Sequence, residues 1–314
     1  MNKLDALNGA LVADAASMGL HWLYDQDQIQ ALQATGDIIF RHPDFSVYEN
    51  RKAFFAHSAR RSGQLSHYGE SARIVGQLAL EGQYTPQNHQ QAFMASFGPC
   101  GSYVGYADRP TKSLIARIIT DGEHLLENSG IEDDQLPALC VLPGLFAANA
   151  QVTLIEQAAT VISTHSHVNT AAKVILNCLN AIAEGESLPN ALEISARTAD
   201  PELASKLSEA LNWSEYQPLA VSKHFGMACK VHQGLPVVWH LLKHVTEFEG
   251  AVRDNTLCGG DSCGRAMVLG AIAGYVFGVP SSMIGKLTDA RIPINFTETE
   301  TETETETETE TETN

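Results

Sequence analysis

The residues best able to do chemistry lie between Leu257 and Arg265, where Leu-Cys-Gly-Gly-Asp-Ser-Cys-Gly-Arg precedes a long apolar run. Two glycines followed by an aspartate and a serine indicate a tight turn and the N-cap of a helix. Free backbone N–H groups and the positive end of the helix dipole favour an anion, or a carboxylate that holds a metal, at such a place. The alternative is that Asp261 or Ser262 only caps a buried helix, and the spacing supports both interpretations.

A second polar segment holds Ser66, His67, Tyr68 and Glu70, just before a helix that we expect to begin near Ser71. The hydroxyl and the carboxylate offer oxygen ligands, and the imidazole and the phenol can donate or accept protons. In a fold that brings the two segments together, these side chains face the Asp261 turn. The alternative is a structural role, which is the commoner one for a single His or Tyr.

The elements that must position these residues are helices. Apolar residues recur at three- and four-residue spacing in segments 74–80, 114–126, 154–162, 171–183 and 237–245. The run at 266–280 contains three glycines and is too short for a membrane span, so it suits a buried helix. Strand-like alternation is scarce, and its longest candidate, 37–40, is too short to anchor a sheet. The pattern predicts an all-α chain.

Composition limits the possible partners and the compartment. Of the formal charge of −17, eight glutamates belong to the Thr/Glu repeat at 297–313, which leaves −9 for the body. An acidic body repels phosphate backbones, so we expect no nucleic acid as a partner, and no membrane. The six cysteines form no paired motif, which is typical of reduced thiols in a cytoplasmic protein. With no apolar residue to bury, the tail at 294–314 should be disordered beside one domain at 1–293.

Several segments in matching order resemble the ADP-ribosylglycohydrolase superfamily, and together they span about residues 5 to 290. They are the opening helix at 9–19, the loop at 106–111, the Thr-His segment at 163–169, and the Gly-Gly-Asp turn at 259–261 with its apolar helix and the closing Gly278-Val-Pro280. The resemblance implies a single compact orthogonal multi-helix bundle. It also implies hydrolysis of the glycosidic bond between ADP-ribose and a protein side chain, assisted by two Mg²⁺ ions held by carboxylates.

The sequence departs from the family at both metal-binding segments. Cys263 and Gly264 replace the second Asp and the last Thr of Gly-Gly-Asp-Thr-Asp-Thr, and 63–70 replaces a Trp-Thr-Asp-Asp-Thr cluster. The remaining oxygen ligands are Asp261, Ser66 and Glu70. Because Mg²⁺ takes about six oxygens and gains little from a thiol, we expect one Mg²⁺ ion or none, and no organic cofactor. The altered pattern is similar to the J1-crystallin branch of the superfamily.

The resemblance also assigns roles to individual residues. Asp261 would be the surviving base and Glu70 the second carboxylate. The segment from His21 to Asp25 can stack on an adenine or bond a ribose, although its aromatics can equally be core residues. The residues expected to contact substrate are His21, Trp22, Asp25, His67, Tyr68, His165, Gly259, Gly260, Ser262 and Arg265.

Several of these residues have a structural alternative. His165 and Thr164 can equally form a helix cap, and Asp108 with Arg109 is more typical of a salt-bridged surface turn than of a substrate contact. Arg265, in the first turn of the apolar helix, opposes the helix dipole. We therefore expect it to have an anionic partner, either Asp261 or a bound phosphate.

Three functions remain open. The leading hypothesis is a hydrolase that recognises ADP-ribose, a related nucleotide sugar or an ADP-ribosylated substrate, with reduced or altered metal dependence. The second is a catalytically inactive binding or structural protein of the same fold. The third is a metal-independent hydrolase of another glycosidic or amide bond. Cys263 would then be the nucleophile, activated because a helix N-terminus lowers a thiol pKa.

Overall fold

The structure is a computed structural model that describes residues 1–122, 130–213 and 215–288, and every described element is helical. In the first half these are α1 (Leu4–Ser17), η1 (Met18–Leu20), α2 (Gln26–Thr35), α3 (Phe45–Tyr48), α4 (His67–Leu80), α5 (Pro86–Phe97), α6 (Arg109–Asp121), η3 (Leu136–Val141), α7 (Leu142–Ala147) and α8 (Val152–Ile162). In the second half they are α9 (Ser166–Ala183), α10 (Leu188–Ala196), α11 (Pro201–Asn212), α12 (Pro218–Phe225), α13 (Val231–His244), α14 (Phe248–Leu257), α15 (Ser262–Phe277) and α16 (Ser281–Ile284).

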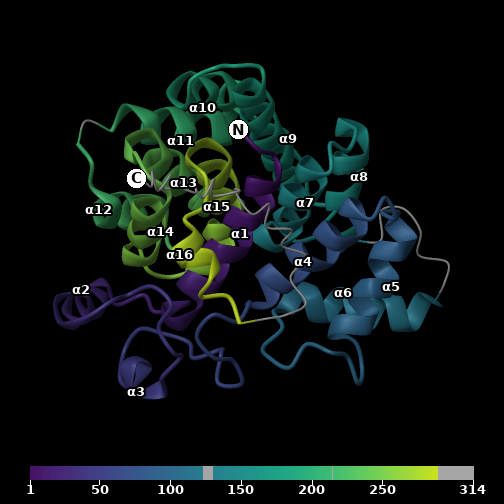
Figure 1. The fold of residues 1–314 in the computed structure, drawn as a ribbon, viewed down its shortest axis with the longest axis horizontal. Coiled ribbons are helices and arrows are strands. Elements are labelled where there is room, and N and C mark those ends of the chain that lie inside the picture. The colour runs from purple at the N-terminus through teal and green to yellow at the C-terminus, as the bar shows by residue number, and fades with distance from the viewer. Residues whose placement is uncertain (123–129, 214, 289–314) are drawn as a thin grey trace, which may run out of the picture.

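Helices α1 and α15 form the centre of the molecule, and the others surround them (Figure 1). α1 is rich in Ala and Leu, α15 is rich in Ala and Gly, and almost every residue of each is buried. Glycines let the two backbones touch, since a Cβ on Gly270 would lie 2.4 Å from the carbonyl oxygen of Gly9. The apolar run at 266–280 is therefore a buried core helix, as its length predicted.

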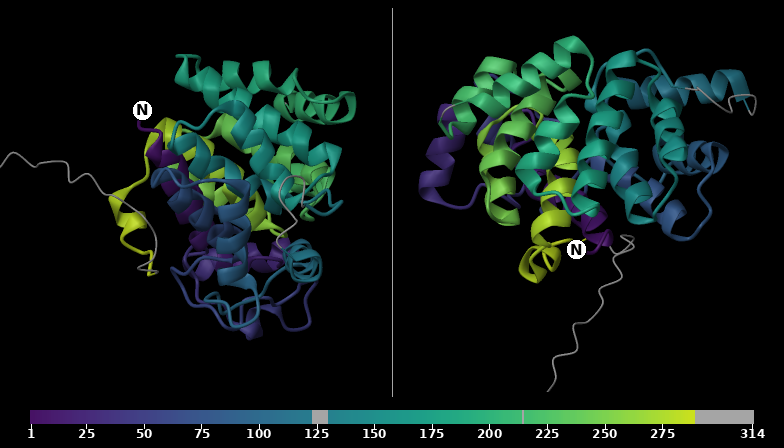
Figure 2. Two further views of the ribbon diagram at one scale, coloured as in Figure 1. Left: turned by 90° about the vertical axis from the view of Figure 1, so that its right-hand side faces the viewer. Right: turned by 90° about the horizontal axis from the view of Figure 1, so that it is seen from above.

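The surrounding helices cross the central pair at many different angles (Figure 2). Figure 1 shows α4 to α6 on one side, α12 to α14 on the other, and α9 to α11 above. This arrangement agrees with the predicted orthogonal bundle. Between residues 1 and 288, apart from the two gaps, β-pairing is limited to isolated bridges, and no helix has the length and apolarity to cross a membrane.

The predicted helical segments are confirmed within the described residues, but one start was wrong. The helix expected near Ser71 begins at His67, because the Ser66 side chain accepts a hydrogen bond from the backbone N–H of Tyr68 and caps the helix there. His67, Tyr68 and Glu70 therefore lie in the first turn of α4 rather than before it. The predicted disorder of 294–314 falls outside the described residues.

Candidate functional site

The Gly-Gly-Asp turn joins α14 to α15 at the centre of the molecule. Gly259 and Gly260 have φ angles of 70° and 65°, a left-handed conformation that favours glycine. Two backbone hydrogen bonds of 2.7 Å tie the turn to the segment after α1, from Trp22 N–H to the Gly260 carbonyl and from Gly260 N–H to the Leu23 carbonyl. Asp261 then caps α15 by accepting from the N–H of Gly264 at 3.1 Å. The predicted cap is confirmed.

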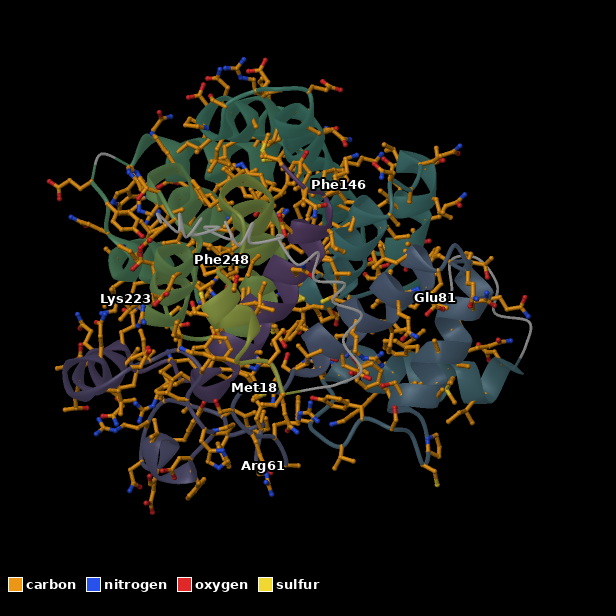
Figure 3. All side chains as sticks on the ribbon, in the orientation of Figure 1. Met18, Arg61, Glu81, Phe146, Lys223 and Phe248 are labelled. Carbon is orange, nitrogen blue, oxygen red and sulfur yellow. The ribbon has the colours of Figure 1, made fainter. Side chains whose placement is uncertain are left out.

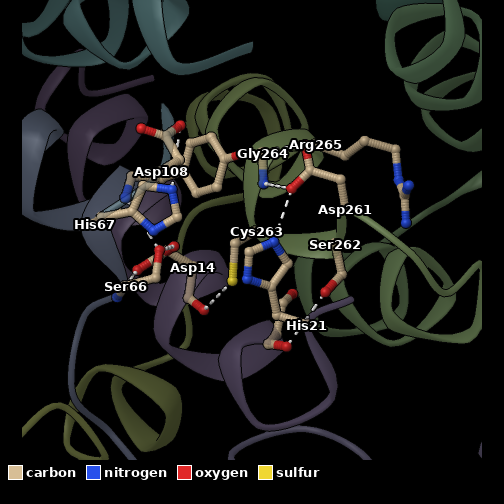
Figure 4. Close-up of polar contacts among 12 residues, drawn as sticks. Asp14, His21, Ser66, His67, Asp108, Asp261, Ser262, Cys263, Gly264 and Arg265 are labelled. Carbon is tan, nitrogen blue, oxygen red and sulfur yellow. Dashed lines mark hydrogen bonds and ion pairs between the residues drawn. The ribbon is translucent and has the colours of Figure 1, made fainter. Parts of the chain in front are cut away.

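Asp261 is also the centre of a fully buried network of side chains (Figure 4). The His21 Nε2 lies 2.8 Å from its Oδ1, and the Tyr68 hydroxyl donates to its Oδ2 at 3.2 Å. On the other side of the imidazole, the His21 Nδ1 lies 2.7 Å from the Nε2 of His57. The sequence interpretation placed Tyr68 opposite the Asp261 turn and assigned His21 only to substrate binding, and the structure brings both side chains into direct contact with Asp261.

Burial fixes the protonation states in this network. It lowers the pKa of His21 and, more strongly, that of His57, while it raises the pKa of Tyr68 well above its ordinary value. Near neutral pH both imidazoles are therefore uncharged and the phenol keeps its proton. Asp261 is surrounded by neutral hydrogen-bond donors rather than by cations.

A second carboxylate, Asp14 of α1, lies beside this network. Its two oxygens accept from the backbone N–H of Ser66 at 2.7 Å and from the Ser66 hydroxyl at 2.5 Å. Full burial raises the pKa of Asp14 to about 6. The Sγ of Cys263 lies 3.7 Å from the Asp14 backbone carbonyl. Ser66 thus donates two hydrogen bonds to Asp14 and also caps the start of α4.

Aromatic and imidazole side chains fill the space over Asp261. The His67 Nε2 lies 3.4 Å from the Oδ2 of Asp108, which caps α6. The Trp22 ring lies 4.3 Å from the His21 ring and 5.2 Å from the Tyr106 ring, measured between centroids. Within residues 1–122, 130–213 and 215–288, no group accepts a hydrogen bond from its buried indole N–H. Trp22 is therefore a core aromatic whose polar atom is still unsatisfied.

A cavity of about 480 Å³ lies next to the turn, and its lining includes Tyr24, Lys52, Phe54, Lys223 and Met227. No acidic side chain lines it, although the whole chain carries a charge of −17. Lys223 comes from α12 and lies near the edge of the molecule (Figure 3). Met227 separates the cavity from the turn, because a Cβ on Gly259 would lie 2.7 Å from its Cε.

Glu70, the expected second carboxylate, has another role. Its carboxylate receives two hydrogen bonds from Arg73, at 3.0 and 2.8 Å, and one from Ser96 at 2.6 Å. One helical turn after Ser66, it lies on the side of α4 that faces α5. The structure gives it a buried ion pair, and the chemistry predicted with Asp261 has no support in these contacts.

Four other expected contact residues have structural roles. Asp25 caps α2 and pairs with Arg51, and His165 caps α9. The Ser262 hydroxyl donates to the backbone carbonyl of Ser17 at 3.3 Å. Arg265 donates to the Asn255 side chain and to the Asn255 and Gly259 carbonyls, so the predicted pairing with Asp261 is wrong.

The interpretation of Cys263 as an activated nucleophile is also wrong. Its side chain is fully buried, and burial together with the Asp14 and Asp261 carboxylates raises the thiol pKa well above its ordinary value. These effects outweigh the helix dipole, which would lower it. At neutral pH the group is a thiol and a poor nucleophile.

The residues around Asp261 do not fit a pair of Mg²⁺ ions. Mg²⁺ requires about six oxygens in octahedral geometry. Here the oxygens of Asp14 and Asp261 already accept hydrogen bonds, and the groups around them are imidazoles, a phenol and a thiol. In the described part of the chain, the potential ligand set at this place is His21, His57 and Cys263, which is nitrogen- and sulfur-rich. This ligand set therefore does not suit magnesium.

Sequence reasoning missed several residues of this site. His57 and Lys52 lie in a segment without helical periodicity, and Lys223 lies on a helix that was not predicted. Asp14 belongs to the opening helix that was recognised, but it was not assigned a role. Asp108 was interpreted as part of a surface turn, whereas it is 3% exposed. The usable signal in the sequence was an aspartate just before a Pro-containing helix start, which predicts an N-cap rather than a free surface side chain.

Comparisons with known proteins agree with this fold. The ADP-ribosylglycohydrolase family model matches residues 3–307. Crystallin J1A of Tripedalia cystophora is 20% identical over 315 residues, which cover 93% of this chain and 94% of the crystallin. A solved structure described as an ADP-ribosylglycohydrolase-related protein complex superposes with a TM-score of 0.65 at 15% identity, covering 91% of this chain and 92% of that one.

Proposed function

Because the chain belongs to the ADP-ribosylglycohydrolase family, we propose that it binds ADP-ribose or a related nucleotide sugar and, without a magnesium pair, hydrolyses the glycosidic bond that joins this group to a protein side chain, so that water adds to the sugar and the side chain is released. The observation that carries the proposal is the cavity lined by Lys52 and Lys223 beside the Gly-Gly-Asp turn. Its volume of about 480 Å³ lies within the usual range for small-molecule sites.

The cavity matches the chemistry of a nucleotide sugar. Two ammonium groups with no acidic neighbour in the lining suit a diphosphate, and the Tyr24 and Phe54 rings offer surfaces for a base. Neither lysine forms an ion pair with any residue that the structure describes. A local positive site on an acidic protein is also selective, because the overall charge repels anions elsewhere.

Asp261 is the group best able to activate water. Its oxygens contact only neutral donors, so the carboxylate can accept a proton from a water that attacks the anomeric carbon. His21 and Tyr68 orient it. Substrate access requires Met227 to move from the turn, and its unbranched side chain has the necessary freedom.

The first test is calorimetric titration of ADP-ribose into the full chain in EDTA. We expect Lys223→Glu and Lys52→Glu each to weaken binding at least about tenfold, the loss of one charge-assisted contact. Lys173→Glu, on an exposed part of α9, makes the same charge change away from the cavity and should leave the affinity unchanged. Absence of binding at millimolar ADP-ribose, in EDTA and in Mg²⁺, would overturn the proposed substrate class.

A second candidate function is a catalytically inactive protein of the same fold. It is favoured by the complete burial of Asp261 under His21 and Tyr68, and by the similarity to a crystallin. Hydrolysis assays on ADP-ribosylated protein distinguish the two. If the chain binds ADP-ribose but product forms no faster than with Asp261→Asn, the inactive alternative holds.

A further inference from the structure

Three helices place a metal-ligating side chain at the same point, away from Asp261. His167, Glu202 and His232 are each the second residue of their helix, in α9, α11 and α13. One ligand atom of each lies within 4.8 Å of the other two. The three helices are neighbours in the upper part of Figure 1. Side chains from separate helix starts therefore converge without a shared local motif.

His232 is held between two carboxylates. Its Nδ1 lies 3.3 Å from the Oε1 of Glu202, and its Nε2 lies 3.6 Å from the Oδ2 of Asp200. His232 is only 7% exposed, and both its Nε2 and the Asp200 Oδ2 are buried without a hydrogen-bond partner among the described residues. The other oxygen of Asp200 already caps α11. The cluster is thus not satisfied by its own contacts.

This geometry matches the support that proteins give to a metal-binding histidine. A histidine ligand usually donates its second ring N–H to a carboxylate, which fixes the tautomer and the direction of the free nitrogen. Here an Nε2–H directed at Asp200 leaves the Nδ1 lone pair of His232 on the side of Glu202. Asp200 would orient the imidazole and Glu202 would bind the ion.

His167 supplies the third ligand. Its ring stacks on that of His232 with centroids 3.9 Å apart, an arrangement that suits neutral rather than charged imidazoles. The side chain is only half-buried, which leaves room for the ring to turn toward an ion.

We propose that His167, Glu202 and His232 bind one Zn²⁺ or a similar divalent transition-metal ion, with water as the fourth ligand. Two imidazoles and one carboxylate form a set that zinc accepts readily and that Mg²⁺ does not favour. Lys206, which now donates to the Glu202 Oε1 at 2.9 Å, must share or release that oxygen. Binding would join the starts of α9, α11 and α13.

The test is calorimetric titration of Zn²⁺ into the full chain after removal of metals with EDTA. We expect one ion per chain at this cluster, with affinity at least about tenfold weaker in His167→Ala and in Glu202→Gln. His224→Ala is the matched control, because His224 pairs with Glu209 in an exposed His/Glu contact without a third ligand. Unfolding curves in EDTA show whether each variant folds. His167→Ala should disturb the fold least, because the His167 side chain is only half-buried.

Cobalt spectra distinguish this site from the buried set of His21, His57 and Cys263. Co²⁺ bound by His167, Glu202 and His232 should show ligand-field bands without the near-ultraviolet charge-transfer band of a thiolate. A thiolate band that disappears in Cys263→Ser, or zinc affinity unchanged in His167→Ala, would overturn the proposal. Neither result depends on whether the chain binds ADP-ribose, so the two proposals can fail separately.

Discussion

At the scale of single residues, Asp14 and Asp261 illustrate how buried carboxylates are stabilised without cations. Each accepts hydrogen bonds from uncharged groups: Asp14 from Ser66, and Asp261 from His21, Tyr68 and the start of α15. Such hydrogen bonds offset part of the cost of burying charge. For Asp14, burial raises the pKa more than the hydrogen bonds from Ser66 lower it, and the result is a pKa of about 6.

The raised pKa of Asp14 predicts how its contribution to stability changes with pH. Because burial raises the pKa from 3.8 to about 6, the folded state binds more protons than the unfolded state between these values. The contribution is fully present below pH 4 and is lost as the pH rises through 6. We expect the wild-type free energy of unfolding, relative to Asp14→Asn, to fall by about 3 kcal/mol from pH 4 to 7. Urea unfolding of both proteins measures it, and a pH-independent difference would contradict it.

Residue types near the turn were predictable from the sequence, whereas their partners were not. The Gly-Gly-Asp spacing predicted the cap on α15, since capping is a local effect. The partner of Glu70 depends on the side of α4 on which Glu70 lies. Because the predicted helix start was four residues too late, the sequence could not indicate that side. His57 lies 36 positions from His21 and was found only through the fold.

At the scale of elements, the contact between α1 and α15 depends on having no side chain at three positions. A Cβ on Gly9 would lie 2.1 Å from the Gly270 carbonyl oxygen, and one on Gly274 would lie 2.4 Å from the Asp5 carbonyl oxygen. Backbone atoms on both sides leave little freedom to adjust. The two helices can be this close only while these positions remain glycine.

Gly270→Val should therefore destabilise the protein strongly. The added atoms meet the backbone of α1 rather than a flexible side chain, so we expect a loss of at least about 3 kcal/mol in the free energy of unfolding. Gly36→Ala is the control: its φ of 170° is extended and its Cβ meets nothing within 4 Å. Chemical denaturation of both variants measures the effect. A loss below about 1 kcal/mol for Gly270→Val would show that the helices can separate without cost.

Helices with strong periodicity could be predicted from sequence, and short or weakly periodic ones could not. The apolar spacing predicted both ends of α8 and the C-terminal ends of α9 and α13 closely, whereas it placed the starts of α9 and α13 more than a helical turn too late. Helices such as α2 and α12 have few buried residues, so their sequences carry little periodic signal. The missed α12 carries Lys223, which is why the cavity was not anticipated.

At the scale of the whole molecule, the hydrogen bonds to Asp14 and Asp261 predict how the melting temperature responds to magnesium. An ion that binds the folded state raises the melting temperature. Because the oxygens of Asp14 and Asp261 are already used, we expect excess Mg²⁺ to change the melting temperature by less than about 1 °C relative to EDTA. Differential scanning calorimetry measures this directly. A rise of several degrees with Mg²⁺ would mean that these carboxylates rearrange around an ion.

The central pairing of α1 and α15 also bears on how the protein is made. Gly9 and Gly270 touch although 260 residues separate them, and almost every side chain of α1 is buried in the finished structure. During synthesis at roughly 5–20 residues per second, α1 leaves the ribosome about 13 to 50 s before its partner. During that time α1 can pack against earlier helices such as α4 and α7, but the face that α15 covers has no partner. The face of α1 that α15 covers in the finished structure is thus open to chaperones and to aggregation during that interval.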